Sequence, residues 1–161
     1  MESDFKTIDE AMSLFFQTMK RPQRWAAITA QAGIDLDRPA AFILQTLLIN
    51  QGQRNRVQDL AAQLGIEAPS VTRKTQELEQ AGYLRRTPDP NDGRAIDLEV
   101  TPAGRAIGER LWEAQRASTR QVLRDWPAAD RRQFVNLFKR FSQDITDYHQ
   151  DSYAKQTERN D

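Results

Sequence analysis

The sequence predicts a mainly helical fold with a small two- or three-stranded β element, flanked by long helices at both ends. Apolar residues recur every three or four positions along most of the 161 residues, which is the spacing of one face of an α-helix. Glycine and proline interrupt this pattern at the intervals expected of short helices. Between Tyr83 and Val100 the pattern changes to the alternation typical of β-strands.

The N-terminal part predicts two helices joined at a proline. The first ends before Pro22, which suits the first turn of the second helix. Gly33 is a suitable C-terminal stop for the second helix. The apolar stripe of the first helix consists of Phe5, Ile8, Met12, Phe15, Phe16 and Met19.

A core helix is predicted next, followed by two helices in close succession. Asp37 is suited to cap the core helix, which runs from about Arg38 to Asn50 and buries Phe42, Ile43, Leu44, Leu47 and Leu48. A helix of two turns at Val57–Leu64 ends at Gly65, and a turn of about four residues leads to a helix that has Pro69 in its first turn. This is helix-turn-helix spacing, and Gly65 can adopt the positive φ that a sharp turn requires.

A β-hairpin with a long polar tip follows the helix-turn-helix. Its strands are predicted at Tyr83–Thr87 and around Ile96–Val100, and the residues between them are rich in Pro, Asp, Asn and Gly. Thr101-Pro102 then combines a capping residue with a proline at the first helical position, so a long helix begins there.

The C-terminal part predicts two helices and a tail. The helix that begins at Pro102 continues to about Asp125, and Trp126-Pro127 interrupts it. A last helix runs roughly from Ala129 to Tyr148, and residues 150–161 are expected to fray. The apolar stripe of this last helix consists of Phe134, Leu137, Phe138, Phe141, Ile145 and Tyr148.

Composition argues against several classes of function. The chain has no cysteine and one histidine, His149, so thiol chemistry is excluded and metal catalysis is disfavoured. We expect no enzyme, no metal and no cofactor, with His149 as a solvated surface residue. No stretch approaches the ~20 apolar residues that span a bilayer, and Met1–Asp4 lacks the profile of a signal peptide. We therefore expect a cytoplasmic protein without membrane contact.

A formal net charge of zero hides a basic central region. Residues 1–10 contain one lysine against four acidic residues, and residues 144–161 contain two basic against five acidic residues. Both ends are therefore acidic and the body of the chain carries the opposite excess. Such an excess is compatible with a polyanionic partner such as DNA.

Five stretches in the centre of the chain carry a specific sequence pattern in a fixed order. They are Val57–Gly65, Pro69–Arg73, Leu78–Leu84, Asp89–Arg94 and Leu98–Gly104. With these stretches the chain resembles the MarR family of winged-helix transcription regulators, and the resemblance covers nearly the whole chain. It implies N-terminal dimerisation helices at 1–36, a winged helix-turn-helix DNA-binding domain at 37–101, and C-terminal dimerisation helices at 102–149, before the frayed tail at 150–161.

The sequence departs from the family pattern at three places. Thr75 stands where the family usually has an aliphatic core residue, and Arg56 stands where a small capping residue is common. Asn55 can cap the helix in place of Arg56, which would leave Arg56 free to face DNA. Pro22 divides what is commonly one long helix.

A recognition helix presents the residues of its N-terminal part to base edges in the major groove, while contacts to phosphate set its register. We expect Arg73 to carry base recognition, and Arg86 to contact phosphate or solvent. The alternative for this helix is an ordinary solvated face. The expected DNA-binding residues of the helix-turn-helix and the first strand are Arg56, Ser70, Thr72, Arg73, Lys74, Gln76 and Arg86.

The polar tip of the hairpin carries one further cation. Arg94 can reach a neighbouring minor groove, where narrow A·T-rich DNA attracts guanidinium groups, and the resemblance implies this role. Asp92 can orient Arg94 through a charge-assisted hydrogen bond. The alternative is that Asp92 and Arg94 only pair with each other across the turn.

The terminal stripes imply a homodimer. Left alone, their aromatic residues would form a large exposed apolar patch, and a MarR-like dimer interlocks its terminal helices. The alternative is a core within one chain. The expected interface residues are Phe5, Ile8, Met12, Phe15, Phe134, Phe138, Phe141 and Ile145.

The resulting hypothesis is a homodimeric regulator of transcription that binds a palindromic operator in double-stranded DNA, with repression as the family-level expectation. Trp25 and Trp112 are candidate residues for a small aromatic or anionic effector, or are ordinary core residues. A different class stays open, in which the winged domain binds an acidic protein partner and no specific DNA.

Overall fold

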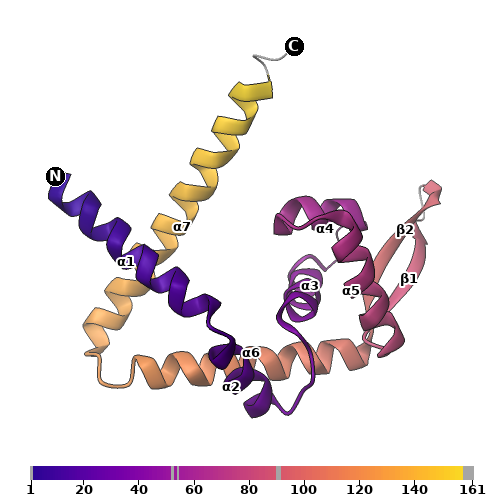
Figure 1. The fold of residues 1–161 in the computed structure, drawn as a ribbon, viewed down its shortest axis with the longest axis horizontal. Coiled ribbons are helices and arrows are strands. Elements are labelled where there is room, and N and C mark those ends of the chain that lie inside the picture. Colours follow the sequence, from indigo (N-terminus) through magenta and orange to yellow (C-terminus); the bar gives the residue numbers. More distant parts are fainter. Residues whose placement is uncertain (1, 52, 54, 90–91, 158–161) are drawn as a thin grey trace. The chain divides into compact units, whose positions relative to one another are not determined.

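The computed structural model describes residues 2–51, 53, 55–89 and 92–157, with the side chains of residues 2, 89, 92–95 and 149–157 outside the description. Within these ranges the chain forms seven helices and one two-stranded sheet (Figure 1). The mainly helical class with a small β element is therefore confirmed. The elements are α1 (Glu2–Lys20), α2 (Pro22–Ala32), α3 (Arg38–Ile49), α4 (Val57–Leu64), α5 (Ala68–Gln80), β1 (Leu84–Asp89), β2 (Asp92–Val100), α6 (Pro102–Val122) and α7 (Ala128–Thr157).

The chain divides into two compact units. The first covers Met1–Ser118 and contains the helix-turn-helix and the hairpin, and the second covers Thr119–Asp161 and contains α7. Because the boundary lies inside α6, most of this helix belongs to the first unit. The two units are described separately below.

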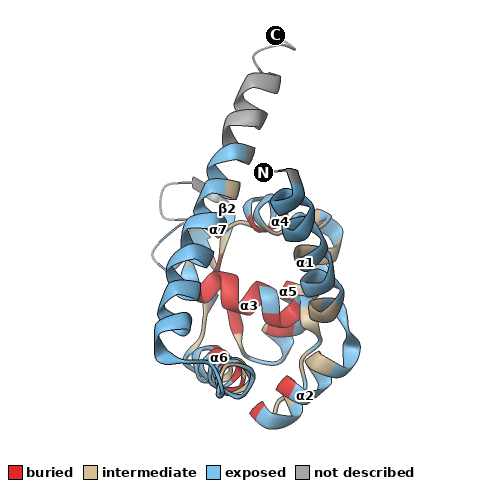
Figure 2. Ribbon diagram, turned by 90° about the vertical axis from the view of Figure 1, so that its left-hand side faces the viewer, coloured by how far each residue is buried: buried red, intermediate tan, exposed pale blue. Residues whose placement is uncertain are grey.

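The core of the first unit is built around α3. Figure 2 shows buried residues concentrated on this helix and on the elements that pack against it. One face of α3 therefore supports α4, α5 and both strands. The buried members of this cluster are Ala40, Ile43, Leu44, Leu47 and Leu48 of α3, Leu60 and Ala61 of α4, Val71 and Leu78 of α5, and Leu84 and Leu98 of the hairpin.

The predicted caps and turns of the helix-turn-helix are confirmed. Asp37 caps α3 by accepting a hydrogen bond of 2.9 Å from the backbone N–H of Ala40. Gly65 ends α4 with φ 62° and ψ 35°, a left-handed conformation that carries little steric cost only for glycine. The turn that follows brings α5 across α4 within a few residues.

The hairpin is antiparallel, with Leu84 opposite Val100 and Arg86 opposite Leu98. Its register becomes irregular between Pro88 and Asp89, next to the tip. The backbone N–H of Leu98 also donates a hydrogen bond of 3.1 Å to the carbonyl of Asn55. Of the two alternatives, a two- or three-stranded element, the described residues form the two-stranded one, and Asn55 adds one backbone hydrogen bond at the edge of β2.

Helix α6 lies close to both the hairpin and α3. Its cap is Thr101, whose Oγ1 accepts from the N–H of Gly104 at 3.0 Å and donates to the carbonyl of Gly82 at 2.7 Å. A Cβ added at Gly104 would lie 2.1 Å from the backbone oxygen of Tyr83. Glycine at this position therefore permits the close approach of α6 to the base of the hairpin.

Two expectations about individual residues need correction. The capping role of Asn55 is wrong, because its Oδ1, the atom that would accept from the helix N–H groups, accepts no hydrogen bond from the described residues. Its Nδ2 donates to the carbonyl of Gln53 at 3.1 Å, and Arg56 is the N-cap residue. Phe42 is exposed rather than buried, and the guanidinium of Arg38 lies 5.3 Å from its ring centroid. This cation–π contact gives Phe42 a partner on the surface.

Both C-terminal helices end at different residues from those expected. The helix α6 ends at Val122, before the Trp126-Pro127 break, instead of at Asp125. The helix α7 continues to Thr157 rather than ending at Tyr148. The segment after Tyr148 contains neither glycine nor proline, so nothing in it interrupts the helix.

Candidate nucleic-acid interface

One face of α5 is buried and the opposite face is polar and exposed. Val71, Thr75 and Leu78 recur at helical spacing and point into the core. Arg73 and Gln76 lie on the exposed side. The core therefore fixes the rotation of α5 about its axis and turns Arg73 and Gln76 outward.

Thr75 is accommodated in the core in place of an aliphatic residue. It has no exposed surface, and its Oγ1 donates to the backbone carbonyl of Thr72 at 2.9 Å. The hydroxyl is thus satisfied within α5, which removes most of the cost of burying it. Thr75 therefore belongs to the buried face of α5 together with Val71 and Leu78.

The first turns of α5 supply the remaining polar residues that sequence analysis selected. Ser70 and Thr72 are half-buried, and the hydroxyl of Thr72 donates to the carbonyl of Ala68 at 2.9 Å. Arg73 makes no side-chain hydrogen bond or ion pair in the part of the chain that the structure describes. Its guanidinium is therefore available to a partner outside the chain.

Lys74 is placed differently from Arg73, although the two are neighbours in sequence. Its Nζ lies 2.5 Å from Oδ2 of Asp37 and 2.6 Å from Oε2 of Glu77, and its side chain is only 12% exposed. We call these three side chains the Asp37–Lys74–Glu77 cluster. The cluster joins the capping residue of α3 to the middle of α5, so Lys74 is not the free ammonium that a phosphate contact needs.

The cluster also shifts two pKa values. Burial alone would raise the pKa of the Asp37 carboxyl, but hydrogen bonds from Lys74 and from the N–H of Ala40, with the charges of Lys74 and Arg73, lower it overall. The hydrogen bonds to Asp37 and Glu77 raise the pKa of Lys74. Asp37 and Lys74 are therefore both charged at neutral pH.

Arginines of β1 are paired with carboxylates at the base of the hairpin. The Nε of Arg86 lies 2.9 Å from Oε2 of Glu79 and so links the hairpin to the end of α5. Arg85 pairs with Glu99 across the strands at 2.5 Å. These pairs leave Arg86 close to α5 but already bonded to a carboxylate.

For the other residues selected from the sequence, Arg56, Asp92 and Arg94, the structure gives less detail of the side chains. Arg56 is half-buried at the start of α4, with a backbone in the extended region and no side-chain capping bond. Asp92 and Arg94 belong to β2, but their side chains lie outside the described residues. Ser70, Thr72, Arg73 and Gln76 thus lie on one helix. DNA contact by these four residues stays a prediction, as does contact by Arg56 and Arg94.

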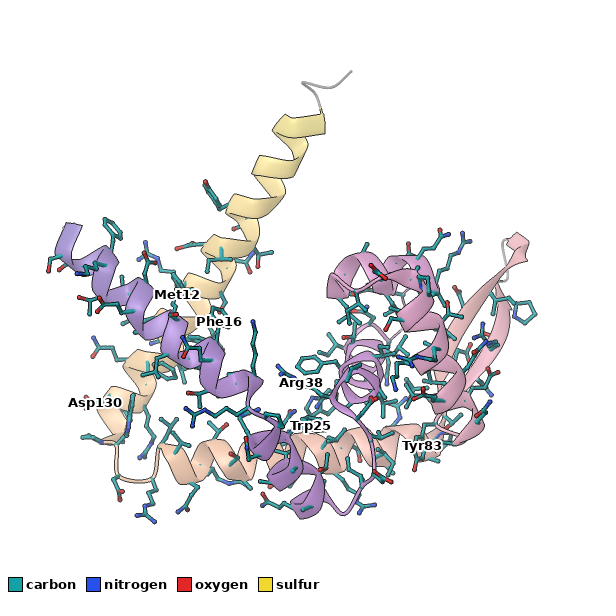
Figure 3. The ribbon with its side chains drawn as sticks, viewed as in Figure 1. Met12, Phe16, Trp25, Arg38, Tyr83 and Asp130 are labelled. Atoms are coloured by element: carbon teal, nitrogen blue, oxygen red, sulfur yellow. The ribbon has the colours of Figure 1, made fainter. Side chains whose placement is uncertain are left out.

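The terminal helices carry exposed apolar stripes. In α1, Phe5 is 57% exposed, and Met12 and Phe16 lie further along the helix (Figure 3). In α7, Phe138 is 47% exposed and stacks on Phe134 with ring centroids 5.5 Å apart. The other exposed apolar members are Ile8, Leu14, Phe15 and Phe16 in α1 and Phe134, Val135, Leu137, Phe141 and Tyr148 in α7; Met12 and Ile145 are half-buried.

Trp25 and Trp112 belong to different parts of the core. Trp25 of α2 packs against a cluster that contains Ile28 and Leu111, and its Nε1 donates to the carbonyl of Leu36 at 3.0 Å (Figure 3). Trp112 packs against the cluster around α3. Packing accounts for both residues, and an effector contact stays a prediction.

Two features concern the described chain as a whole. Its helices include none that is both long enough and apolar enough to cross a membrane. The described Asp and Glu side chains form no group of three or more that could hold a metal ion, and the side chain of His149 lies outside the described residues.

The sequence of the central region matches known proteins. The MarR family model matches residues 36–96. Over 61 residues, 38% of this chain, the sequence is 31% identical to the HTH-type transcriptional regulator BilQ of Clostridioides difficile (strain CD3). The match covers 41% of that regulator, so the sequence similarity is confined to less than half of the curated relative.

Solved structures share the fold over most of the chain. A MarR family protein from Bacillus stearothermophilus superposes with a TM-score of 0.77 at 16% identity, covering 91% of this chain and 98% of the other. The S. aureus MepR–DNA complex superposes with a TM-score of 0.62 at 19% identity, covering 81% and 94%. At these identities the likeness establishes the fold.

A helix-turn-helix that is followed by a β-hairpin and flanked by long helices defines the winged helix-turn-helix class. Within this class, residues 36–96 match the MarR family model and are similar in sequence to the curated regulators. The chain therefore contains a MarR-type domain at residues 36–96. Members of this family are transcription regulators and not enzymes.

Sequence reasoning missed the Asp37–Lys74–Glu77 cluster. The pair of Lys74 and Glu77 at a spacing of three residues was a visible signal. The third member, Asp37, is separated from Lys74 in the sequence by helices α3 and α4. Only the packing of α5 on α3 brings the two side chains together.

Proposed function

We propose that this protein is a sequence-specific regulator of transcription that binds double-stranded DNA as a homodimer. The observation that carries this proposal is the presentation of α5, whose buried face is fixed by the core while Arg73 and Gln76 face outward. The match of residues 36–96 to the MarR family model supports the same function, as does the similarity to BilQ, which is a transcriptional regulator.

In this proposal α5 enters the major groove. Arg73 donates to the base edges, with Gln76, Ser70 and Thr72 in adjacent positions, because guanidinium and amide groups match the donor and acceptor pattern of that groove. Arg56 contacts phosphate from the start of α4. Arg86 reaches phosphate only by sharing or releasing its bond to Glu79.

The hairpin is proposed to extend the contact to the flanking minor groove. Arg94 inserts there and reads the width of the groove more than the base edges, and Asp92 orients it. This role rests on the place of Arg94 near the start of β2, at the opposite end of the hairpin from the pair of Leu84 and Val100.

The exposed stripes of α1 and α7 are proposed to form the dimer interface. Large exposed apolar faces of this kind are typical of protein–protein contacts. A two-fold dimer places two α5 helices about one turn of DNA apart, so the preferred operator is palindromic. We further propose that the dimer represses by covering the promoter, and that a small aromatic or anionic effector releases it.

Selection of duplexes from a random pool tests the proposal. We expect the full chain to enrich a palindrome whose half-sites are about 10 base pairs apart, with an affinity that falls steeply as salt rises. Salt-dependent binding to every duplex without enrichment would contradict specific regulation. Binding to an acidic protein with no affinity for DNA would favour the alternative of a protein-interaction module.

A further inference from the structure

The Asp37–Lys74–Glu77 cluster lies directly beside the guanidinium that is proposed to read DNA. Lys74 follows Arg73 in α5, and its Nζ contacts one carboxylate from the start of α3 and another from its own helix. Asp37 and Glu77 are about half exposed, whereas Lys74 is almost covered. Lys74 therefore sits between two carboxylates that would otherwise be open to other cations.

Both carboxylates are close enough to compete for Arg73. Glu77 is four residues after Arg73 and lies on the same side of α5, a spacing at which oppositely charged side chains pair. Asp37 lies against the same turn of α5 through its contact with Lys74, and the charge of Arg73 contributes to the low pKa of Asp37. Without Lys74, both carboxylates would lack their 2.5–2.6 Å partner, and Arg73 would be the nearest cation along the helix.

We propose that Lys74 is a positioning residue that neutralises Asp37 and Glu77 and thereby keeps Arg73 free to contact DNA. This inference rests on the proposed DNA-binding function and assigns Lys74 a role that differs from phosphate contact. A phosphate-binding lysine is exposed and flexible, whereas Lys74 is 12% exposed and bonded to two carboxylates. If Lys74 bound a phosphate instead, it would give up its bonds to Asp37 and Glu77. Both carboxylates would then lie near DNA without a counter-charge.

Three variants separate the two roles of Lys74. Lys74→Met removes the ammonium and keeps a long side chain. A triple variant adds Asp37→Asn and Glu77→Gln, and it keeps the cap of α3 because asparagine caps a helix as well as aspartate does. The control triple variant has the same net charge and combines Lys74→Met with Asp59→Asn and Glu67→Gln, two carboxylates outside the cluster.

The measurement is a titration of each variant, and of Arg73→Ala, on the duplex that the parent protein selects, over a range of salt concentrations. We expect Lys74→Met to weaken specific binding about 10- to 100-fold, as Arg73→Ala does. The triple variant with Asp37→Asn and Glu77→Gln should recover most of this loss, and the control triple should not. Lys74→Met should add little in the Arg73→Ala background, because both act on the same contact.

Three other results would contradict the role of Lys74 or the proposed DNA-binding function. If Lys74 binds phosphate directly, Lys74→Met lowers the salt dependence of binding by the amount expected for about one phosphate contact. The triple variant with Asp37→Asn and Glu77→Gln then recovers no more specific affinity than the control triple, and this result overturns the proposal. If the parent selects no sequence, the proposed function fails and the inference fails with it. If the parent selects a sequence and Arg73→Ala weakens binding while Lys74→Met does not, only the inference is wrong. Circular dichroism and thermal unfolding of every variant establish that the folded state is being compared.

Discussion

Phe138→Ala tests the assignment of the α7 stripe to a dimer interface. Phe138 is 47% exposed in the single chain. A fully covered phenylalanine buries about 150–250 Å², so about 100 Å² remains for a partner. At about 25 cal/mol per Å² this area is worth about 2.5 kcal/mol per protomer. A two-fold interface contains the residue twice, and alanine keeps part of the area, so the dimer should lose about 4 kcal/mol.

This loss corresponds to a rise of about 1,000-fold in the Kd of the dimer. Sedimentation equilibrium over a wide range of concentrations measures it, with Asn136→Ala on the opposite side of α7 as the control. A Kd within a few-fold of the control would refute the interface. If instead Phe138 belongs to a core within one chain, the variant lowers the unfolding free energy of a monomer, independently of concentration.

Three further predictions concern the fold, the cluster and the hairpin. Gly104→Ala should destabilise the protein in urea unfolding although alanine favours helices by about 1 kcal/mol, because the new Cβ would lie 2.1 Å from the backbone oxygen of Tyr83; a more stable variant would contradict the close approach of α6. The pKa of Asp37 is lowered in the folded state, so its contribution to stability is present above its unfolded value of about 3.9 and is lost as the pH falls through the folded value. The difference in unfolding free energy between the parent and Asp37→Asn should accordingly shrink as the pH falls below about 5, and a constant difference would argue against the ion pair. Arg94→Ala should weaken binding most to operators with A·T-rich flanks, and Arg94→Lys should recover only part of the loss because ammonium is more strongly hydrated; equal binding by parent and Arg94→Ala to both kinds of flank would make the hairpin purely structural.

The helix-turn-helix was predictable because its signals are local. Gly65, Pro69 and Asp37 act through the backbone conformation of the residues next to them, and the structure has each in the expected role. The alternation after Tyr83 likewise predicts the hairpin without knowledge of the rest of the fold. These elements therefore follow from short stretches of sequence.

The misjudged residues depend on contacts between elements. Phe42 fits the apolar face of α3 by spacing, but the residues around α3 leave it on the surface beneath Arg38. Asn55 has the side chain of a good cap, but its amide is engaged by the carbonyl of Gln53 and its backbone by Leu98. A single sequence does not show which residues of other elements will surround Phe42 or bond to Asn55.

The same reasoning separates Arg73 from Lys74 at the candidate site. Sequence analysis treats both as cations at the entrance of one helix. Only the approach of Asp37 from α3 distinguishes them, because it binds the ammonium of Lys74 and leaves the guanidinium of Arg73 outside the cluster. The roles of neighbouring residues on a recognition helix thus depend on what lies behind the helix.

The most direct test of the account is the ratio of affinities for the selected palindrome and for a scrambled duplex of the same composition, measured by fluorescence anisotropy at one salt concentration for the parent and for Arg73→Ala. We expect the parent to prefer the palindrome by at least about 1,000-fold. Arg73→Ala should lower this ratio by about 5- to 100-fold while binding to the scrambled duplex changes little. A parent that binds both duplexes equally, or a variant that loses both affinities in parallel, would contradict base recognition by α5.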